Sequence, residues 1–346
     1  MGKIRRGQRI GILTAGGDCP GINAAIRGVG KTAIVKYGMN LIGISDGFTG
    51  MINKEYRELT EHDLSGILTL GGTILGTSRE KPFKSTGKGK NEISKPVLIR
   101  EHYEQMGLDC LVCIGGNGTQ KTAYLLSQEG LNVIGIPKTI DNDVWGTDLT
   151  FGFDSAVNIA TEAIDRLHST ANSHKRIMII ELMGHNAGWI ALYSGIAGGG
   201  DVILIPEIEY NEDKIAEYLL HRVNENKPYS IVVLAEGIKN PGKDRSAAQY
   251  LSKRISEMTG LETRETVLGY IQRGGTPSPM DRVLATRYGS AAADLIAECD
   301  FGKMVALKNT GIISVPLAEV AGKLKLVVPN DPLVIQAQNM GTSFGI

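Results

Sequence analysis

Short apolar runs alternate with segments of helical periodicity along most of this chain. Seven runs, most of them rich in β-branched residues, predict buried strands: residues 10–13, 41–44, 110–114, 133–136, 177–182, 202–205 and 231–235. Six segments between or after them carry apolar residues at helical spacing: residues 21–37, 120–129, 154–170, 186–197, 212–223 and 279–297. Strands that alternate with helices form parallel sheets covered on both faces. The sequence therefore predicts an α/β fold of three α/β/α layers, with ligands bound beyond the carboxyl ends of the strands.

The size and charge balance of the chain limit its class of partner. With 346 residues and 42% hydrophobic content, the chain is long enough for two medium-sized cores, as in a two-domain enzyme. Lysine and arginine together number 37, as do aspartate and glutamate, which argues against nucleic acid or an anionic membrane surface as partner. No apolar run approaches a membrane span, and the first run is too short for a signal peptide. We therefore expect a cytoplasmic protein with a small-molecule substrate.

The four cysteines, Cys19, Cys110, Cys113 and Cys299, are expected to be buried free thiols in a reducing compartment. Cys110 and Cys113 lie three apart in a predicted strand, so their side chains point to opposite faces and cannot share a metal ion. Residues 81–96 are rich in Lys, Ser, Gly and Pro and predict an exposed loop.

Two segments in the middle of the chain predict a phosphoryl-transfer site. Residues 115–119 (Gly-Gly-Asn-Gly-Thr) follow one predicted strand and offer bare backbone N–H groups to phosphate oxygens, because glycine allows close approach. Residues 137–143 (Pro-Lys-Thr-Ile-Asp-Asn-Asp) follow the next strand and offer carboxylates at i and i+2. Such a pair suits a metal-bound nucleotide beside a hydroxyl that loses a proton. Taken alone, the second segment is equally consistent with an Asx-rich turn.

Further groups at the margins of predicted strands suit anions or sugars. Residues 14–21 (Thr-Ala-Gly-Gly-Asp-Cys-Pro-Gly) join the first strand to a helix, and they suit either an anion at the helix N-terminus or simple close packing. Basic groups before a strand, such as Arg176, are also typical of a solvated edge. The remaining groups end strands or bracket a strand-like run: residues 183–188, Glu236 and residues 264–275.

The ordered set of motifs resembles the 6-phosphofructokinase family along nearly the whole chain. The motifs that carry the resemblance are Gly16-Gly17-Asp18 with Pro20-Gly21, residues 23–28 (Asn-Ala-Ala-Ile-Arg-Gly), residues 115–119, residues 139–143, Met183-Gly184, Leu268-Gly269 and residues 271–275 (Ile-Gln-Arg-Gly-Gly). The resemblance implies an oligomeric two-domain α/β enzyme of glycolysis. It would transfer the terminal phosphoryl group of ATP to the 1-hydroxyl of fructose 6-phosphate, giving fructose 1,6-bisphosphate and ADP. The donor-binding domain would comprise residues 1–152 and 272–320, and the sugar-phosphate-binding domain residues 153–271 and 321–346.

The family's catalytic segment matches residues 138–143 of this sequence. Asp141 would be the general base that takes the proton of the sugar hydroxyl, Thr139 would line the same oxygen, and Asp143 would lie near Mg²⁺. A carboxylate within hydrogen-bond reach of the hydroxyl contributes roughly 10²–10⁴-fold, and positioning and charge stabilisation supply the rest. Lys138 matches a lysine of pyrophosphate users, in which its charge would neutralise the transferring group.

The resemblance also assigns residues to the sugar phosphate. Arg176, Arg264 and Arg273 would hold the phosphate, because guanidinium groups match phosphate geometry, and Glu236 would accept sugar hydroxyls. In the family, the residues that match Arg176 and Arg264 reach in from a neighbouring subunit, which implies a homodimer or homotetramer. The other implied positions are Met183, Gly184, His185 and Tyr270, of which the last two replace an Arg and a His common in the family.

On the donor side, the resemblance implies contacts from six residues: Gly17, Phe48, Arg79, Gly118, Thr119 and Thr122. Phe48 is almost equally well explained as a hydrophobic loop residue, and Arg79 as a surface charge instead of a polyphosphate ligand. Gly118 is the small residue of ATP users, whereas pyrophosphate users carry an Asp whose bulk and charge would exclude an adenylated donor. Gly118 with Lys138 is therefore a mixed signature, for which ATP is the expected donor.

Magnesium would be bound through Asn117 and Asp143. Asn117 stands where the family usually has an Asp, and an amide oxygen is a neutral and weaker ligand for a hard cation. Arg27 and Lys31 match positions that bind effectors in bacterial relatives. A solvated helix face explains these two residues as well, and the pattern is too incomplete to predict allostery.

Two other functions stay open on sequence alone. Lys138 supports a pyrophosphate-dependent fructose 6-phosphate 1-phosphotransferase. A non-catalytic regulatory subunit would follow if Asn117 and His185 together abolished turnover. A site without turnover, however, has no chemical reason to keep both Asp141 and Asp143, which favours an enzyme.

Overall fold

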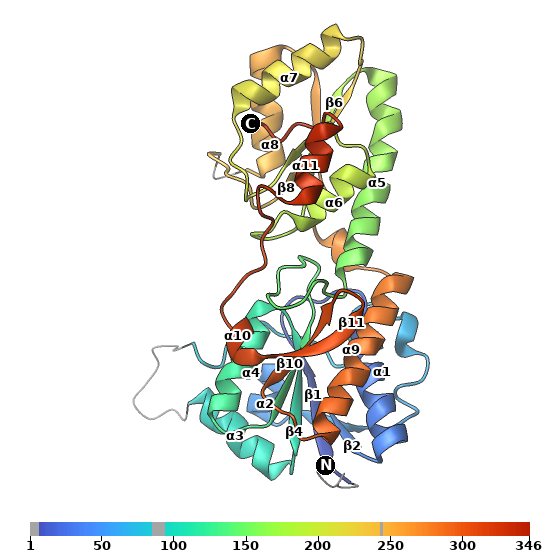
Figure 1. Cartoon of the computed structure of the whole chain (residues 1–346), viewed down its shortest axis with the longest axis vertical. Coiled ribbons are helices and arrows are strands. Elements are labelled where there is room, and N and C mark those ends of the chain that lie inside the picture. The colour runs from blue at the N-terminus through green and yellow to red at the C-terminus, as the bar shows by residue number, and fades with distance from the viewer. Residues whose placement is uncertain (1–6, 85–93, 243–244) are drawn as a thin grey trace. The chain divides into compact units, whose positions relative to one another are not determined.

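The computed structural model describes residues 7–84, 94–242 and 245–346, which form two compact units (Figure 1). Unit 1 comprises Met1–Thr139, Asp143–Gly152 and Arg273–Leu324, and unit 2 comprises Ile140–Asn142, Phe153–Gln272 and Lys325–Ile346. Each unit has helices around its own largely parallel sheet, which confirms the predicted α/β fold. Which ligand each unit binds stays a prediction.

Unit 1 contains a seven-stranded sheet in the order β11-β10-β5-β4-β1-β2-β3. Its five central strands are parallel, and the edge strands β3 and β11 are antiparallel to their neighbours. The central strands are almost wholly buried, as expected for a parallel sheet covered on both faces. The strands are β1 (Arg9–Thr14), β2 (Asn40–Ile44), β3 (Tyr56–Leu59), β4 (Cys110–Gly115), β5 (Val133–Pro137), β10 (Lys303–Lys308) and β11 (Gly311–Pro316).

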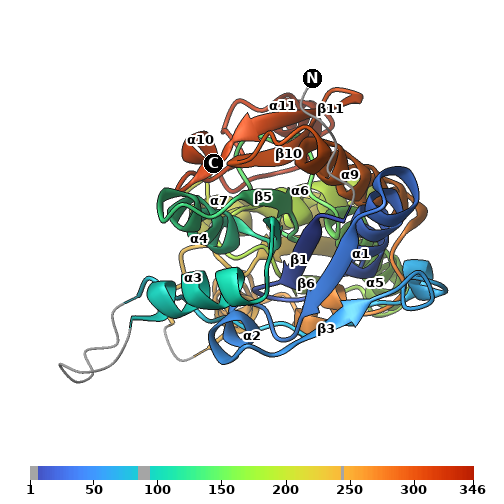
Figure 2. The ribbon, with the colours of Figure 1, turned by 90° about the horizontal axis from the view of Figure 1, so that it is seen from below.

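Helices cover both faces of this sheet, with α1 and α9 together on one side and α3 and α4 on the other (Figure 2). Two glycines permit the close approach of α1 and α9. A Cβ on Gly28 would lie 2.7 Å from the carbonyl oxygen of Thr286, and one on Gly289 would lie 2.5 Å from that of Ala25. The helices of unit 1 are α1 (Ile22–Lys31), followed by a π-helical turn (Thr32–Lys36), α2 (Phe48–Asn53), α3 (Lys95–Gln105), α4 (Asn117–Gln128), α9 (Pro279–Ala297) and α10 (Leu317–Val320).

Unit 2 contains a fully parallel four-stranded sheet in the order β7-β8-β6-β9. Its strands are β6 (Ile177–Leu182), β7 (Val202–Leu204), β8 (Ser230–Ala235) and β9 (Thr263–Val267). α5 packs against α6, and α7 packs against α8 (Figure 1). The helices are α5 (Phe153–His174), α6 (Trp189–Ala197), α7 (Glu212–Asn224), α8 (Ala247–Thr259) and α11 (Pro332–Asn339), with a 3₁₀ turn at Gly269–Arg273.

All seven predicted strands and all six predicted helices are present. Two of the strands that the apolar pattern did not predict are poorly buried: three of the four β3 residues are exposed, and β11 has no fully buried position. β10 was also not predicted, although four of its six residues are buried. The predicted loop 81–96 is wrong at its end, because α3 begins at Lys95, and residues 85–93 lie outside the described residues.

All four cysteines are free thiols, and Cys19, Cys110 and Cys113 are buried as predicted. Burial raises the pKa of the Cys19 thiol to about 12. The prediction is wrong for Cys299, which is exposed in the turn after α9 and has a φ of 57°.

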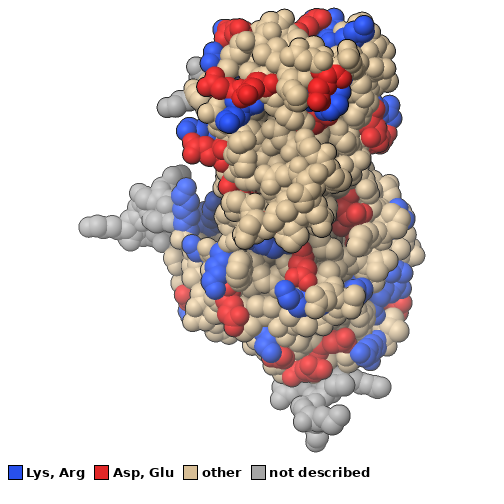
Figure 3. All heavy atoms as spheres, turned by 45° about the horizontal axis from the view of Figure 1, so that its top comes forward, with Lys and Arg blue, Asp and Glu red and all other residues tan. Residues whose placement is uncertain are grey.

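Basic and acidic side chains are interspersed on the face drawn in Figure 3, and neither sign gathers there into a single patch. Of the helices that the structure describes, none combines the length and the hydropathy that a membrane span requires.

Candidate active site

Two glycine turns of unit 1 lie side by side because the strands before them are paired. β1 and β4 are parallel neighbours, with Thr14 opposite Ile114. The backbone N–H of Ala15 donates to the carbonyl oxygen of Ile114 at 3.0 Å, and the hydroxyl of Thr119 donates to the carbonyl oxygen of Ala15 at 3.4 Å. The turn after β1 and the turn before α4 therefore form one surface beyond the carboxyl ends of the strands.

The N-terminus of α4 is open to an anion. Its N-cap is Gly116, which has no side chain to accept hydrogen bonds from the first turn, so those N–H groups remain for a ligand. Gly118 is exposed, and a Cβ added there would meet no heavy atom of the described chain within 4 Å. Thr119 and Thr122 are buried, and the Thr122 hydroxyl donates to the carbonyl oxygen of Gly118 at 3.0 Å. Packing thus leaves room beside Gly118 for a ligand.

Two cations hold the turn after β1. Lys138 follows β5 and is only 3% exposed, and its ammonium donates to the carbonyl oxygen of Gly17. Nη1 of Arg273 donates to the carbonyl oxygen of Asp18 at 3.1 Å and would lie 2.9 Å from a Cβ on Gly17. Arg273, which the resemblance assigns to the sugar phosphate, therefore contacts the donor-side turn within unit 1.

The predicted magnesium ligands are adjacent. Nδ2 of Asn117 donates to the backbone carbonyl of Asp143 at 3.3 Å, while Oδ1 of Asn117 is buried without a hydrogen-bond partner among the residues that the structure describes. An orphaned buried amide oxygen beside a carboxylate residue fits a hard cation. Within the described parts of the chain, no group of three or more His, Cys, Asp and Glu could hold a metal alone.

The predicted catalytic segment forms hydrogen bonds on both sides of Asp141. The Thr150 hydroxyl donates to the carbonyl oxygen of Thr139 at 2.8 Å. Asn142 is 2% exposed, has a φ of 52°, and accepts a hydrogen bond from the Lys325 ammonium at 2.8 Å. Positive φ at a residue other than glycine is typical of functional segments. Sequence reasoning missed Thr150 and Lys325, since nothing in their spacing links them to this segment.

The other donor-side residues differ in exposure. Phe48 is 1% exposed and packs in the hydrophobic core of unit 1, so the structure supports the hydrophobic alternative for its side chain. Arg79 is exposed and forms no ion pair with any residue that the structure describes. It follows Ser78, whose carbonyl oxygen accepts from the N–H of Gly16 at 2.8 Å. Arg79 is therefore close in sequence and space to the donor-side turn and available to an anion.

In unit 2, one group of predicted sugar-phosphate residues lies at the carboxyl ends of the strands. β6 and β8 end together, with Leu182 opposite Ala235. The backbone N–H of His185 donates to Oε1 of Glu236 at 2.9 Å, and His185 has a φ of 52°. The carboxylate and the imidazole are both exposed at this edge. The remaining members of this group follow β6 and β9: Met183, Gly184 and Tyr270, the last being 75% exposed.

A second group lies at the amino ends of the same strands. Arg176 immediately precedes β6, and Arg264 is the second residue of β9, opposite Met178. Both arginines contact one carboxylate, Glu262, which sequence reasoning missed even though it lies only two positions before Arg264. β6 has six residues and spans about 20 Å at roughly 3.3 Å per residue. Within one chain, the two arginines and Glu236 therefore lie too far apart to contact the same sugar phosphate.

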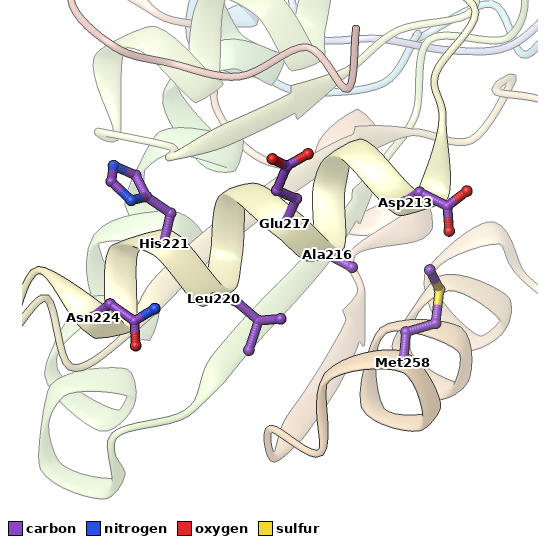
Figure 4. A pocket seen from close by; sticks show the side chains of 7 residues that line it. All are labelled: Asp213, Ala216, Glu217, Leu220, His221, Asn224 and Met258. Atoms are coloured by element: carbon purple, nitrogen blue, oxygen red, sulfur yellow. The ribbon is translucent and has the colours of Figure 1, made fainter.

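The surface pocket drawn in Figure 4 is separate from these residues. It has a volume of about 440 Å³ and lies between α7 and α8. Acidic side chains of α7 border it, which disfavours a phosphate ligand. Its lining consists of Asp213, Ala216, Glu217, Leu220, His221, Asn224 and Met258, none of which belongs to the candidate site.

Paired glycine turns, an uncapped helix N-terminus and an adjacent segment with two carboxylates define the class of α/β phosphoryl-transfer proteins. The model of the family described as Phosphofructokinase matches residues 9–296. The chain therefore belongs to the phosphofructokinase family.

Curated relatives match this chain over its full length. An ATP-dependent 6-phosphofructokinase 3 of Bacteroides thetaiotaomicron is 63% identical over 98% of this chain and 100% of its own. An ATP-dependent 6-phosphofructokinase of Spirochaeta thermophila is 58% identical over 98% of each chain. A pyrophosphate–fructose 6-phosphate 1-phosphotransferase of Amycolatopsis mediterranei is 46% identical over 92% of this chain and 96% of its own.

A solved structure supports the fold. Phosphofructokinase from Saccharomyces cerevisiae matches with a TM-score of 0.81 and 30% sequence identity. The match covers 90% of this chain and 45% of the yeast chain, so the chain spans about half the length of that protein.

Proposed function

We propose that this protein is an ATP-dependent 6-phosphofructokinase that transfers the terminal phosphoryl group of ATP to the 1-hydroxyl of fructose 6-phosphate. The products are fructose 1,6-bisphosphate and ADP, and the reaction belongs to glycolysis in the cytoplasm. The observation that carries the proposal is the 63% identity, over essentially the whole of both chains, to a protein named for this activity. The arrangement of the glycine turns and of residues 138–143 supports it.

The donor phosphates bind at the paired turns. The first-turn N–H groups of α4 and the backbone at Gly17 donate to phosphate oxygens, and Arg79 adds charge from the exposed side. The space beside Gly118 admits a nucleotide, because packing does not fill it. Lys138 lies beside this turn and neutralises charge on the transferring group.

Asn117 and Asp143 would hold Mg²⁺, and the buried Oδ1 of Asn117 is the atom that supports this role. When bound, the ion neutralises phosphate charge and orients the terminal phosphoryl group. Because one of the two ligands is a neutral amide, we expect this site to depend on the nucleotide phosphates for much of its affinity.

Asp141 is the general base. Its carboxylate takes the proton from the 1-hydroxyl of the sugar as the oxygen attacks phosphorus, and the Thr139 hydroxyl lines the same oxygen. The hydrogen bonds to the Thr139 carbonyl oxygen and to the Asn142 side chain restrain the residues on each side of Asp141. Precise placement of the base matters, because phosphoryl transfer depends mostly on positioning.

The sugar binds at the carboxyl ends of β6, β8 and β9, where Glu236 accepts its hydroxyls. Its phosphate is bound by Arg176 and Arg264 of a neighbouring subunit, because these residues lie at the opposite ends of their own strands. The protein is therefore a homodimer or homotetramer in which each sugar site is completed across subunits. Arg273 contacts the donor-side turn in this structure, so it serves the site from the donor side.

A pyrophosphate-dependent enzyme is the second candidate, favoured by Lys138 and by the relative from Amycolatopsis mediterranei. One assay separates the two: formation of fructose 1,6-bisphosphate from fructose 6-phosphate and Mg²⁺, with ATP and pyrophosphate in parallel. We expect activity with ATP and little with pyrophosphate. Activity with pyrophosphate alone would establish the second candidate, and inactivity with both would contradict the proposal.

A further inference from the structure

One carboxylate in unit 2 is shared by two arginines. Oε2 of Glu262 lies 2.8 Å from Nε of Arg176, and Oε1 lies 2.6 Å from Nη2 of Arg264. The two oxygens are thus divided between two guanidinium groups that come from different strands. The side chains of Glu262 and Arg264 are 47% and 53% exposed, so solvent and ligands can reach them, whereas Arg176 is 26% exposed and its Nε is buried.

The charges around Glu262 keep it ionised. The ion pair with Arg176 lowers its pKa, and the nearby positive charge of Arg264 acts in the same direction. Two guanidinium groups and one carboxylate leave a net positive charge at this place. A carboxylate that bridges two guanidinium groups also holds them close together despite their mutual repulsion.

A phosphate group can make the same contacts with the two arginines as the Glu262 carboxylate does, and it carries more negative charge. Its oxygens accept charge-assisted hydrogen bonds from guanidinium forks, as those of a carboxylate do, and it carries close to two negative charges at neutral pH. The same donors cannot serve both anions fully, and the repulsion between Glu262 and a bound phosphate adds to the competition.

We propose that Glu262 is an internal competitor for the phosphate of the sugar substrate: it occupies Arg176 and Arg264 in the empty site and is exchanged for the phosphate when substrate binds. Glu262 thereby sets the affinity of the site and discriminates against weaker anions, which cannot displace it. This inference rests on the proposed function only for the identity of the phosphate ligand.

The test compares Glu262→Gln with wild type. The amide keeps the size of the side chain and removes the charge, and Glu262 is exposed enough for the variant to fold. We expect the KM for fructose 6-phosphate to fall about three- to tenfold with kcat unchanged, as two exposed ion pairs cease to compete. Glu162→Gln is the matched control, since it breaks another glutamate–arginine pair of unit 2, with Arg166 on α5. It should leave KM unchanged. An equal or higher KM in Glu262→Gln would overturn the proposal.

A second measurement separates this inference from the proposed function. Inorganic phosphate is titrated calorimetrically into wild type and into both variants at constant ionic strength. We expect Glu262→Gln to bind phosphate about three- to tenfold more tightly than the other two proteins. If wild type has no kinase activity, the proposed function fails and this titration still decides the role of Glu262. Equal phosphate affinity in all three proteins would overturn the exchange.

Discussion

The two sheets differ in where the predicted site residues lie along their strands. In the seven-stranded sheet of unit 1, the turns beyond β1, β4 and β5 bring the donor-side groups together at one edge. In the four-stranded sheet of unit 2, the predicted sugar-phosphate residues divide between opposite edges, with Glu236 at the carboxyl ends and Arg176 and Arg264 at the amino ends. The proposed donor site can therefore be built by one chain, whereas the proposed sugar-phosphate site requires a second copy.

The largest effect on turnover is expected at Asp141, because the proposed reaction between the donor and the sugar depends on this base. Asp141→Asn removes the base and keeps the shape of the side chain, so kcat should fall by roughly 10²–10⁴-fold. The affinity for fructose 6-phosphate, measured by calorimetry, should change little. Asp213→Asn on α7 is the control and should retain full turnover. An unchanged kcat in Asp141→Asn would show that Asp141 is not the general base.

The proposed donor site can be tested at Gly118, because an added Cβ meets no described heavy atom within 4 Å. Gly118→Asp places a carboxylate beside the phosphates, and like charges in contact cost enough to lower kcat/KM for ATP by roughly 10²-fold. Pyrophosphate use should fall less. Gly118→Ala adds bulk without charge and should stay near wild type, with an unchanged Tm. An equal loss with both donors would show that Gly118 does not select the donor.

The proposed sugar-phosphate site can be tested by a substitution at Arg264. Arg264→Ala removes charge-assisted hydrogen bonds to the phosphate, and the KM for fructose 6-phosphate should rise roughly 10–100-fold while the KM for ATP stays constant. Arg166→Ala, an exposed arginine on α5, is the control. A normal KM for fructose 6-phosphate in Arg264→Ala would place the phosphate elsewhere.

Mixing two defective variants tests whether the second copy is needed. Asp141→Asn and Arg264→Ala subunits are unfolded together, refolded and assayed at low fructose 6-phosphate. If each site takes Asp141 from one subunit and Arg264 from its neighbour, mixed dimers contain one intact site, and about a quarter of wild-type activity should return. The separately refolded variants provide the baseline. Activity that stays at this baseline would contradict the shared site.

Most of the fold was predictable because it depends on local pattern. The buried strands are continuous apolar runs, and a parallel sheet covered on both faces requires such runs. β3 and β11 escaped prediction because edge strands are only partly buried and need no such pattern. Cys299 was expected to be buried, but residue type alone does not reveal that it lies in an exposed turn.

The site was predictable where its residues are adjacent in sequence. Residues 115–119 and 137–143 have local geometries that glycine and Asx residues favour, so their types indicate their conformation. Lys325, Thr150 and Glu262 were missed because their roles depend on contacts between separate segments. The same holds for Arg273, because residues 271–275 alone do not predict its contact with the turn after β1.

The sequence by itself determined the fold class, the glycine turns proposed to bind phosphate and the family, since each depends on short segments whose chemistry is local. The tertiary structure decided which of these segments meet. Strand pairing brings the turns after β1 and β4 together, and the direction of β6 and β9 separates Arg176 and Arg264 from Glu236. The physical reason is that strand order and direction are set by the packing of the whole sheet, which no single segment encodes.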